Sequence, residues 1–303
     1  MKLAIAGCGR ISQVGYAPAL RQVAGAELCA VADPDPGRRD RLAASAPGEA
    51  RAYESVAAML DGSSPDAIVI ASPPARHAEQ AELASAAGIP ALVEKPPGRD
   101  AGEAERLAEL DPPVWVGFNR RFSHLTAVAP RVPASGELEL SLRLCYRRGS
   151  WRAHEVSEDA LGDLGPHLAD LAACLLGGEL RSARARSIEP DRARIELTGD
   201  RGSARVVCRT DSAWAERVEV RRSSGELSAR SVHGGVARST FARLRGGEHP
   251  LVTSLARQLR ALAGVVRGEG GGMLATAREG VTAMRALDAA RASAMDGGEV
   301  VRL

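Results

Sequence analysis

Short apolar runs alternate with helical stretches over the first 118 residues. The apolar runs occupy residues 3–6, 27–32, 67–71, 91–94 and 114–118. Between them lie Ala-rich stretches at helical spacing, such as Arg76–Ala87 and Ala101–Leu110. Parallel strands buried on both faces form continuous apolar runs, and strands that alternate with helices are joined by right-handed crossovers. The pattern predicts an α/β Rossmann domain over residues 1–118, with a doubly wound parallel sheet.

The pattern changes after Phe118. In Glu137–Arg147, leucines alternate with polar residues, and this period of two is typical of a half-buried strand in an antiparallel sheet. Similar runs follow at residues 181–188, 191–197, 202–209, 216–222 and 226–232, and helical patterns cover residues 161–176, 251–266 and 275–294. We therefore predict that residues 119–303 form an α+β domain with a mostly antiparallel, open-faced sheet.

Composition and charge exclude several classes of function. The net charge is +2, with 40 basic and 38 acidic side chains interspersed, and aromatic residues make up 3%. Without a basic stripe or stacking aromatics, a nucleic-acid partner is not indicated. The five cysteines are scattered without C-x-x-C spacing, so we expect neither a disulfide framework nor a metal site. No apolar run approaches membrane-spanning length and no signal peptide precedes the first strand, so we expect a cytoplasmic protein without a membrane partner.

A glycine-rich segment follows the first predicted strand. Gly7 permits a tight turn, and Gly9 lets the backbone approach a pyrophosphate, while Ser12 takes the third glycine position. Asp33 ends the second strand, 21 residues after Ser12, and its carboxylate would accept hydrogen bonds from an adenosine ribose. This spacing predicts a dinucleotide site that includes Arg10 and Ile11 and favours NAD. Arg38 and Arg39 could pair with a 2′-phosphate, so NADP stays an alternative.

Only Lys2 and Lys95 of the 40 basic side chains are lysine. An ammonium loses its proton readily when it is desolvated, whereas a guanidinium does not, so Lys95 is a candidate for proton transfer. Its other interpretation is an ordinary surface lysine.

Asp163 and His167 are a second candidate pair. On a helix, four residues of separation puts them on one face, where the carboxylate raises the imidazole pKa and fixes its tautomer. Because proline lacks an N–H group, Pro166 predicts that the helix begins near Gly165, with Asp163 near its N-cap. A capping Asp beside an incidental His is the alternative.

Taken together, these segments resemble the Gfo/Idh/MocA family of NAD(P)-dependent oxidoreductases over nearly the full chain. The matching segments, in order, are Gly7–Ser12 with Asp33, Ser72–His77, Glu94–Pro96, Gly117–Phe122 and Asp163–Asp170. The resemblance implies that Ser72, Pro73, His77, Glu94 and Asn119 line the cofactor site, and that Lys95 lies beside the nicotinamide and the substrate. A glycine run that often precedes the Asp in this family is replaced here by Ser157–Gly162, which puts the substrate class in doubt.

The resemblance also implies hydride transfer between nicotinamide and a carbinol or carbonyl carbon of a sugar, cyclitol or related polyol. His167 is the expected general acid/base and Asp163 orients it. Lys95 stabilises the alkoxide and shares the proton, although Lys95 and His167 could exchange roles. Arg121, Trp151 and Arg152 are candidate substrate contacts.

Three alternatives stay open. They are NAD-recycling epimerisation or glycoside cleavage, imine reduction, and a non-catalytic dinucleotide sensor. A homodimer or homotetramer through the second sheet is expected from the family. Tyr146 has the pattern of a core residue. His124, His154, His233 and His249 have no partner evident from the sequence, and we interpret them as surface or substrate-lining residues.

Overall fold

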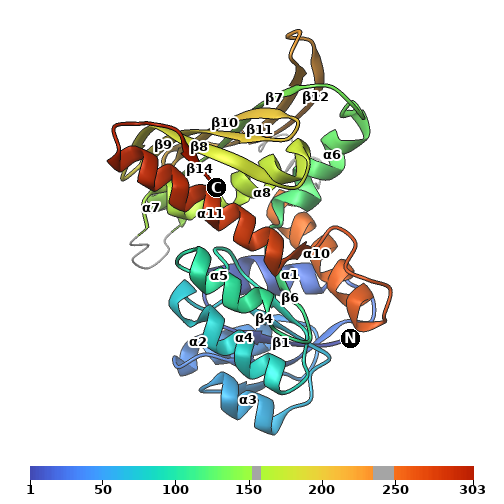
Figure 1. Ribbon diagram of the computed structural model, residues 1–303. Coiled ribbons are helices and arrows are strands. Elements are labelled where there is room, and N and C mark those ends of the chain that lie inside the picture. The colour runs from blue at the N-terminus through green and yellow to red at the C-terminus, as the bar shows by residue number, and fades with distance from the viewer. Residues whose placement is uncertain (152–157, 235–248) are drawn as a thin grey trace. The chain divides into compact units, whose positions relative to one another are not determined.

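The computed structural model describes residues 1–151, 158–234 and 249–303. They belong to two compact units (Figure 1). Unit 1 comprises Met1–Phe122 and His249–Val281, and unit 2 comprises Ser123–Glu248 and Thr282–Leu303.

Unit 1 is built on a seven-stranded sheet in the order β13-β6-β5-β4-β1-β2-β3. Strands β1 to β6 are parallel, and β13 is antiparallel to β6. This is the strand order of a dinucleotide-binding doubly wound fold, in which ligands bind where β1 and β4 diverge at their carboxyl ends. The strands are β1 (Lys2–Ala6), β2 (Glu27–Ala32), β3 (Arg51–Tyr53), β4 (Ala67–Ile70), β5 (Ala91–Val93), β6 (Val114–Val116) and β13 (Ala275–Thr276).

Helices separate these strands in the chain, as the sequence predicts. They are η1 (Ser12–Tyr16), α1 (Ala17–Leu20), α2 (Pro36–Ser45), α3 (Val56–Gly62), η2 (Pro74–Arg76), α4 (His77–Ala86), α5 (Ala101–Ala108) and α10 (Pro250–Val266), and η3 (Arg121–Leu125) begins at the end of the unit. Leu3 and Ile5 of β1 lie in one apolar core, and Ala4 and Ala6 lie in another. The sheet is therefore buried on both faces, which explains the continuous apolar runs.

Helix α10 belongs to unit 1, although the sequence analysis assigned residues 249–281 to the second domain. The reason is hydrophobic packing. Leu255, Leu259 and Leu262 are fully buried and join the same core as Leu3 of β1. The helical pattern in the sequence reveals that this face is apolar, but it does not identify the core that receives it.

Unit 2 contains the second sheet, in the order β12-β11-β7-β10-β9-β8-β14. Its neighbours are antiparallel except β10 and β7, so the predicted mostly antiparallel sheet is confirmed. The strands are β7 (Leu138–Arg147), β8 (Leu180–Glu189), β9 (Arg192–Gly199), β10 (Gly202–Arg209), β11 (Asp211–Arg222), β12 (Leu227–Gly234) and β14 (Val301–Arg302). The helices are α6 (Thr126–Val128), η4 (Ala129–Arg131), α7 (Arg148–Trp151), α8 (Ala160–Leu176) and α11 (Ala277–Met295), whose first turns belong to unit 1.

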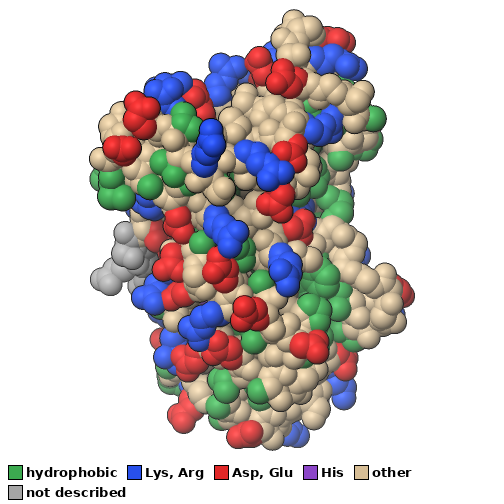
Figure 2. All heavy atoms as spheres, viewed as in Figure 1, with side chains coloured by type: hydrophobic (Ala, Val, Ile, Leu, Met, Phe, Trp, Pro, Cys, Tyr) green, Lys and Arg blue, Asp and Glu red, His purple; other side chains and the backbone are tan. Residues whose placement is uncertain are grey.

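Helix α8 packs on β7, β8, β9 and β10. The leucines of β7 are buried on this side, whereas Glu139 and Arg143 on the opposite face are exposed. The surface view shows basic and acidic side chains interspersed over both units (Figure 2). Within the described ranges, no helix is long and apolar enough to cross a membrane.

Candidate active site

The loop after β1 places two glycines in different surroundings. Gly7 has a positive φ of 88°, and a Cβ built on it would lie 2.5 Å from the backbone N of Ser72. A Cβ built on Gly9 would meet nothing within 4 Å. Gly7 is therefore required by the close approach of the loop to the segment after β4, whereas Gly9 leaves open space beside the backbone.

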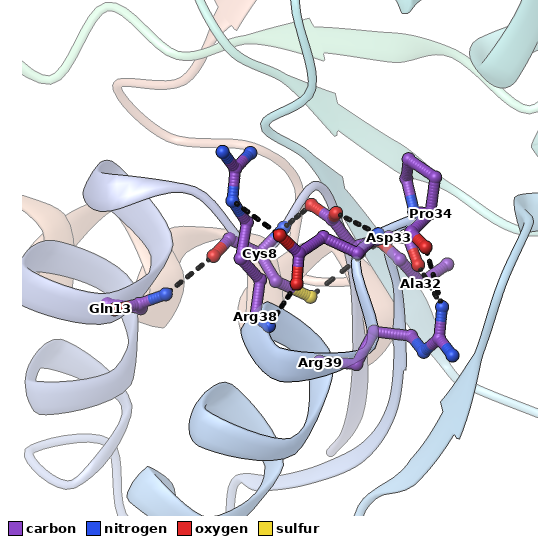
Figure 3. A network of polar contacts seen from close by, with 8 residues as sticks. Cys8, Gln13, Ala32, Asp33, Pro34, Arg38 and Arg39 are labelled. Atoms are coloured by element: carbon purple, nitrogen blue, oxygen red, sulfur yellow. Dashed lines mark hydrogen bonds and ion pairs between the residues drawn. The ribbon is translucent and has the colours of Figure 1, made fainter. Parts of the chain in front are cut away.

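Asp33, at the end of β2, is held by two backbone amides (Figure 3). Its Oδ2 accepts from the N–H of Cys8 at 2.8 Å, and its Oδ1 accepts from the N–H of Asp35 at 2.9 Å. The side chain is buried and joins the glycine loop to the β2–α2 turn. Burial and the Asp33 charge raise the pKa of the Cys8 thiol to about 12, so this thiol is neutral.

The two arginines after Asp33 already have partners. Arg39 donates from Nη1 to the carbonyl oxygens of Asp33 at 2.6 Å and Pro34 at 3.2 Å (Figure 3). Arg38 pairs through Nε with the Asp35 carboxylate at 3.6 Å, and its N–H donates to the same side chain, which caps α2. Both guanidinium groups are thus engaged within the turn itself.

His77 joins the segments that follow β4 and β5. Its Nε2 lies 2.8 Å from the carbonyl oxygen of Ser72, and its Nδ1 lies 2.9 Å from that of Pro96. Burial lowers the pKa of the imidazole, and the two carbonyl oxygens oppose this shift because they favour the protonated ring. The ring therefore joins the segment after β4 to the backbone directly after Lys95. Ser72 also donates its hydroxyl to Gln80 at 2.6 Å, and Pro73 precedes the η2 turn.

Glu94 accepts hydrogen bonds on both carboxylate oxygens. The Tyr16 hydroxyl donates to Oε1 at 2.6 Å, and the N–H of Lys95 donates to Oε2 at 3.1 Å. Burial raises the pKa of the Glu94 carboxyl. This carboxyl group anchors the backbone directly before the Lys95 side chain, which is itself half-buried.

The segment after β6 also contains sequence-predicted residues. Asn119 donates to the Ser254 hydroxyl of α10 at 3.4 Å. Arg121 is buried and forms an ion pair with Glu279 at 2.9 Å, a carboxylate that also accepts from Thr276. Arg121 thus fastens the start of α11 within unit 1, and its predicted contact with substrate stays a prediction.

In unit 2, helix α8 carries both Asp163 and His167 in buried positions. The Tyr146 hydroxyl donates to Asp163 Oδ2, and Arg148 Nη2 lies 3.9 Å from the same oxygen. A cationic and a neutral donor therefore face this carboxylate from the end of β7 and the start of α7. Of the predicted catalytic residues, Lys95 belongs to unit 1, and Asp163 and His167 belong to unit 2.

The predicted start of α8 near Gly165 is wrong. The helix begins at Ala160, with Asp159 as N-cap, and Pro166 lies inside it. The Asp159 side chain accepts from the N–H of Gly162 at 2.8 Å and pairs with Arg291 at 2.6 and 2.8 Å. This cap stabilises two turns ahead of the proline, although Pro166 cannot donate the hydrogen bond expected at its position.

The side chain of Trp151 and the whole of Arg152 lie outside the described residues, as does His154.

Residues 1–111 match a family model described as "Oxidoreductase family, NAD-binding Rossmann fold". The rhizopine catabolism protein MocA of Rhizobium meliloti is 28% identical over 304 residues, which cover 95% of this chain and 93% of that protein. The chain belongs to the Gfo/Idh/MocA family. Membership confirms the predicted fold class and the predicted cofactor, NAD.

Other members of the Gfo/Idh/MocA family are also similar. Inositol 2-dehydrogenase 2 of Saccharopolyspora erythraea is 30% identical over 227 residues, 73% of this chain, and the chain spans 66% of that enzyme. The fold matches scyllo-inositol dehydrogenase from Lactobacillus casei, whose crystal structure holds NAD(H) and scyllo-inositol. The TM-score is 0.81 at 16% identity, covering 100% of this chain and 98% of that one.

Two side-chain contacts could not be predicted from the sequence. Tyr146, interpreted as a core residue, donates its hydroxyl to Asp163. Its position on the same face of β7 as the buried leucines was the feature of the sequence that could have indicated an inward-facing hydroxyl. His124 is buried between Glu216 and Ser231, which are about 90 and 107 positions away, so no local pattern could pair them.

Proposed function

We propose that this protein is an NAD-dependent dehydrogenase that interconverts a carbinol and a carbonyl carbon of a sugar, cyclitol or related polyol. The observation that carries the proposal is the buried Asp163 carboxylate, held by the Tyr146 hydroxyl one helical turn from His167 on α8. The inositol dehydrogenases among the relatives support the substrate class.

The residues around the first glycine loop fit NAD. The space beside Gly9 accommodates a pyrophosphate, and Asp33 is fixed by two amides at the position where this fold binds the ribose. A 2′-phosphate would meet the Asp33 carboxylate, and the engagement of Arg38 with Asp35 and of Arg39 with backbone carbonyls supports NAD over NADP. When bound, NAD supplies the hydride acceptor.

The chain's own residues manage the proton. His167 takes the proton from the substrate hydroxyl oxygen, and Asp163 balances the charge that the imidazole gains. Lys95 donates a hydrogen bond to the same oxygen, stabilises the alkoxide while the hydride leaves, and shares the proton with His167. The buried Glu94 and His77 contacts hold the Lys95 backbone in place. Lys95 and His167 exchange their proton-transfer roles in the alternative form of this mechanism.

Replacing Lys95 by arginine tests the proton role. Lys95→Arg keeps the charge but removes a group that can titrate, so we expect kcat to fall about 100-fold or more, in line with the loss of general acid/base catalysis. Lys2→Arg, which changes the other lysine at the exposed start of β1, is the matched control and should leave kcat unchanged. NADH formation is followed at 340 nm, and near-normal turnover of Lys95→Arg would remove the proton role.

The same assay separates the other activities of this fold. An enzyme that recycles its cofactor would consume substrate without net NADH and would retain NAD through purification. An imine reductase would oxidise NADH only with an imine. A sensor would bind NADH and turn over nothing.

We also propose that the protein is a cytoplasmic homodimer or homotetramer that associates through the open face of the unit 2 sheet. The exposed side chains of Glu139 and Arg143, on the face of β7 opposite its buried leucines, support this proposal. Light scattering after size exclusion measures the mass, and a monomer would contradict it.

A further inference from the structure

A row of polar residues crosses unit 2 on the face of its sheet that α8 covers. Glu216 of β11 lies directly opposite Leu144 of β7, and His233 of β12 lies directly opposite Glu216. Residues directly opposite one another share a face, and Leu144 is buried on the α8 side. Trp214 lies on the same face, because its Nε1 donates to Glu216 Oε1 at 3.1 Å.

Glu216 is the fixed centre of this row. Its other oxygen, Oε2, lies 2.9 Å from Nε2 of His124, and Nδ1 of His124 lies 2.9 Å from the Ser231 hydroxyl. The side chains of His124 and Glu216 are only 2% and 7% exposed. The His233 ring packs edge-on against His124, with a centroid distance of 4.7 Å. A buried pair therefore holds Trp214 from one side and His233 from the other.

The row continues to the predicted catalytic carboxylate. Tyr146 lies two residues beyond Leu144 on β7, on the same face, and donates its hydroxyl to Asp163. The ladder between β7 and β11 is interrupted between Asp211 and Ala215, which puts Trp214 next to Tyr146 in the register. Such interruptions re-aim side chains beside functional sites.

Burial divides these residues into two groups. Glu216, His124 and Ser231 are buried, whereas Tyr146, Trp214 and His233 are half-buried. The half-buried groups keep part of their surface accessible, and the buried groups fix their orientation. This arrangement is expected of a binding site, in which accessible side chains contact the ligand and buried side chains hold them in position.

We propose that Trp214 and His233 form a hydroxyl-recognition subsite for a neutral polyhydroxylated ring, next to Asp163; this rests on the proposed function. The apolar face of the indole packs against the C–H face of the ring, and the imidazole exchanges hydrogen bonds with a ring hydroxyl. The carboxylates of Glu216 and Asp163 lie in the same row, with Arg148 as the nearby cation. The Glu216 and Asp163 carboxylates disfavour a substrate that carries its own carboxylate or phosphate close to them.

The first test is kinetic. For His233→Ala we expect the KM for a neutral polyol to rise about tenfold, the effect of one lost hydrogen bond of roughly 1.4 kcal/mol, with kcat changed less than twofold. Trp214→Leu should behave likewise. Arg230→Ala, on the opposite face of β12 and paired with Glu219, is the matched control and should keep the wild-type KM. The affinity for NADH, whose proposed site is in unit 1, should not change in any of these variants.

Direct binding makes the outcomes distinguishable. Calorimetric titration of myo-inositol into the NADH complex gives the affinity without turnover, and glucuronate compared with glucose tests the preference for a neutral ring. Unchanged polyol affinity in both His233→Ala and Trp214→Leu, or tighter binding of glucuronate than glucose, would overturn the subsite. Wild-type protein that binds NADH yet neither binds nor oxidises any neutral polyol would instead overturn the proposed function. Trp214→Phe keeps an aromatic ring, so it should lose less polyol affinity than Trp214→Leu. This comparison separates the loss of ring stacking from a general loss of folding stability.

Discussion

Removing the N-cap of α8 should destabilise unit 2 and disturb the helix that carries Asp163 and His167. Asp159→Ala removes two interactions at once. The cap accepts from the N–H of Gly162 at 2.8 Å, and both carboxylate oxygens pair with Arg291 at 2.6 and 2.8 Å. Because Pro166 lacks an N–H group, the first turns of this helix depend strongly on the cap.

The structure sets the expected magnitude. Loss of an N-cap costs about 1 kcal/mol. The ion pair is partly exposed, with 23% of the Asp159 side chain and 42% of the Arg291 side chain accessible, so we assign it no more than about 1 kcal/mol after solvent screening. Asp159→Ala should therefore cost about 1.5–2 kcal/mol, which corresponds to a fall of roughly 3–8 °C in Tm.

Two companion variants separate the contributions. Asp159→Asn keeps a good capping side chain but loses the charge, and Arg291→Met loses only the ion pair, so each should cost about half as much as Asp159→Ala. Differential scanning calorimetry at neutral pH measures all three. Equal Tm values for Asp159→Ala and Asp159→Asn would refute the capping argument, and an unchanged Tm in all three would refute the whole account of this helix start.

The pH dependence gives an independent check. Partial burial raises the pKa of Asp159, but the Arg291 guanidinium and the Gly162 N–H outweigh it and hold the pKa below its ordinary value of 3.8. A depressed folded-state pKa contributes stability above pH 3.8 that is lost as the pH falls through the lower value. The Tm difference between wild type and Asp159→Asn should therefore narrow below about pH 4.

Three further predictions concern the cofactor loop and the catalytic carboxylate. Gly7→Ala should lower Tm markedly, because its Cβ would collide with Ser72, whereas Gly9→Ala should keep the wild-type Tm and weaken NADH binding about tenfold; calorimetry and NADH titration compare the pair. Asp33→Ala should reduce the ratio of NADPH to NADH dissociation constants at least severalfold, and an unchanged ratio would remove Asp33 from cofactor selection. Tyr146→Phe should lower kcat and shift its pH profile, since Asp163 loses a donor; a changed KM alone would contradict this positioning role.

Local patterns in the sequence are sufficient to predict much of unit 1. The strands are apolar at consecutive positions because both faces are buried, and the glycines mark the loop where the backbone must turn tightly after β1. Asp33 could be placed beside the glycine loop because its distance from that loop is set by a single β–α–β connection. These features depend on residues close together in the chain.

Features that depend on distant residues could not be predicted. Pro166 indicated a helix start at Gly165, but a cap from Asp159 with Arg291 of α11 moves the start to Ala160. His124 gave no signal, because its partners come from β11 and β12 after a long stretch of chain. The assignment of α10 to unit 1 depends on which hydrophobic core its leucines pack into, and the composition of the helix does not indicate this core.

We expect His167, together with Asp163 and Lys95, to be essential for the NAD-dependent polyol dehydrogenase activity that we propose. The most direct measurement is the initial rate at 340 nm with NAD and a set of neutral polyols that includes myo-inositol, for wild type and His167→Asn side by side. We expect NADH formation by the wild type and a kcat at least about 100-fold lower for His167→Asn, with equal affinity for NADH. A His167→Asn variant that turns over at the wild-type rate would contradict it.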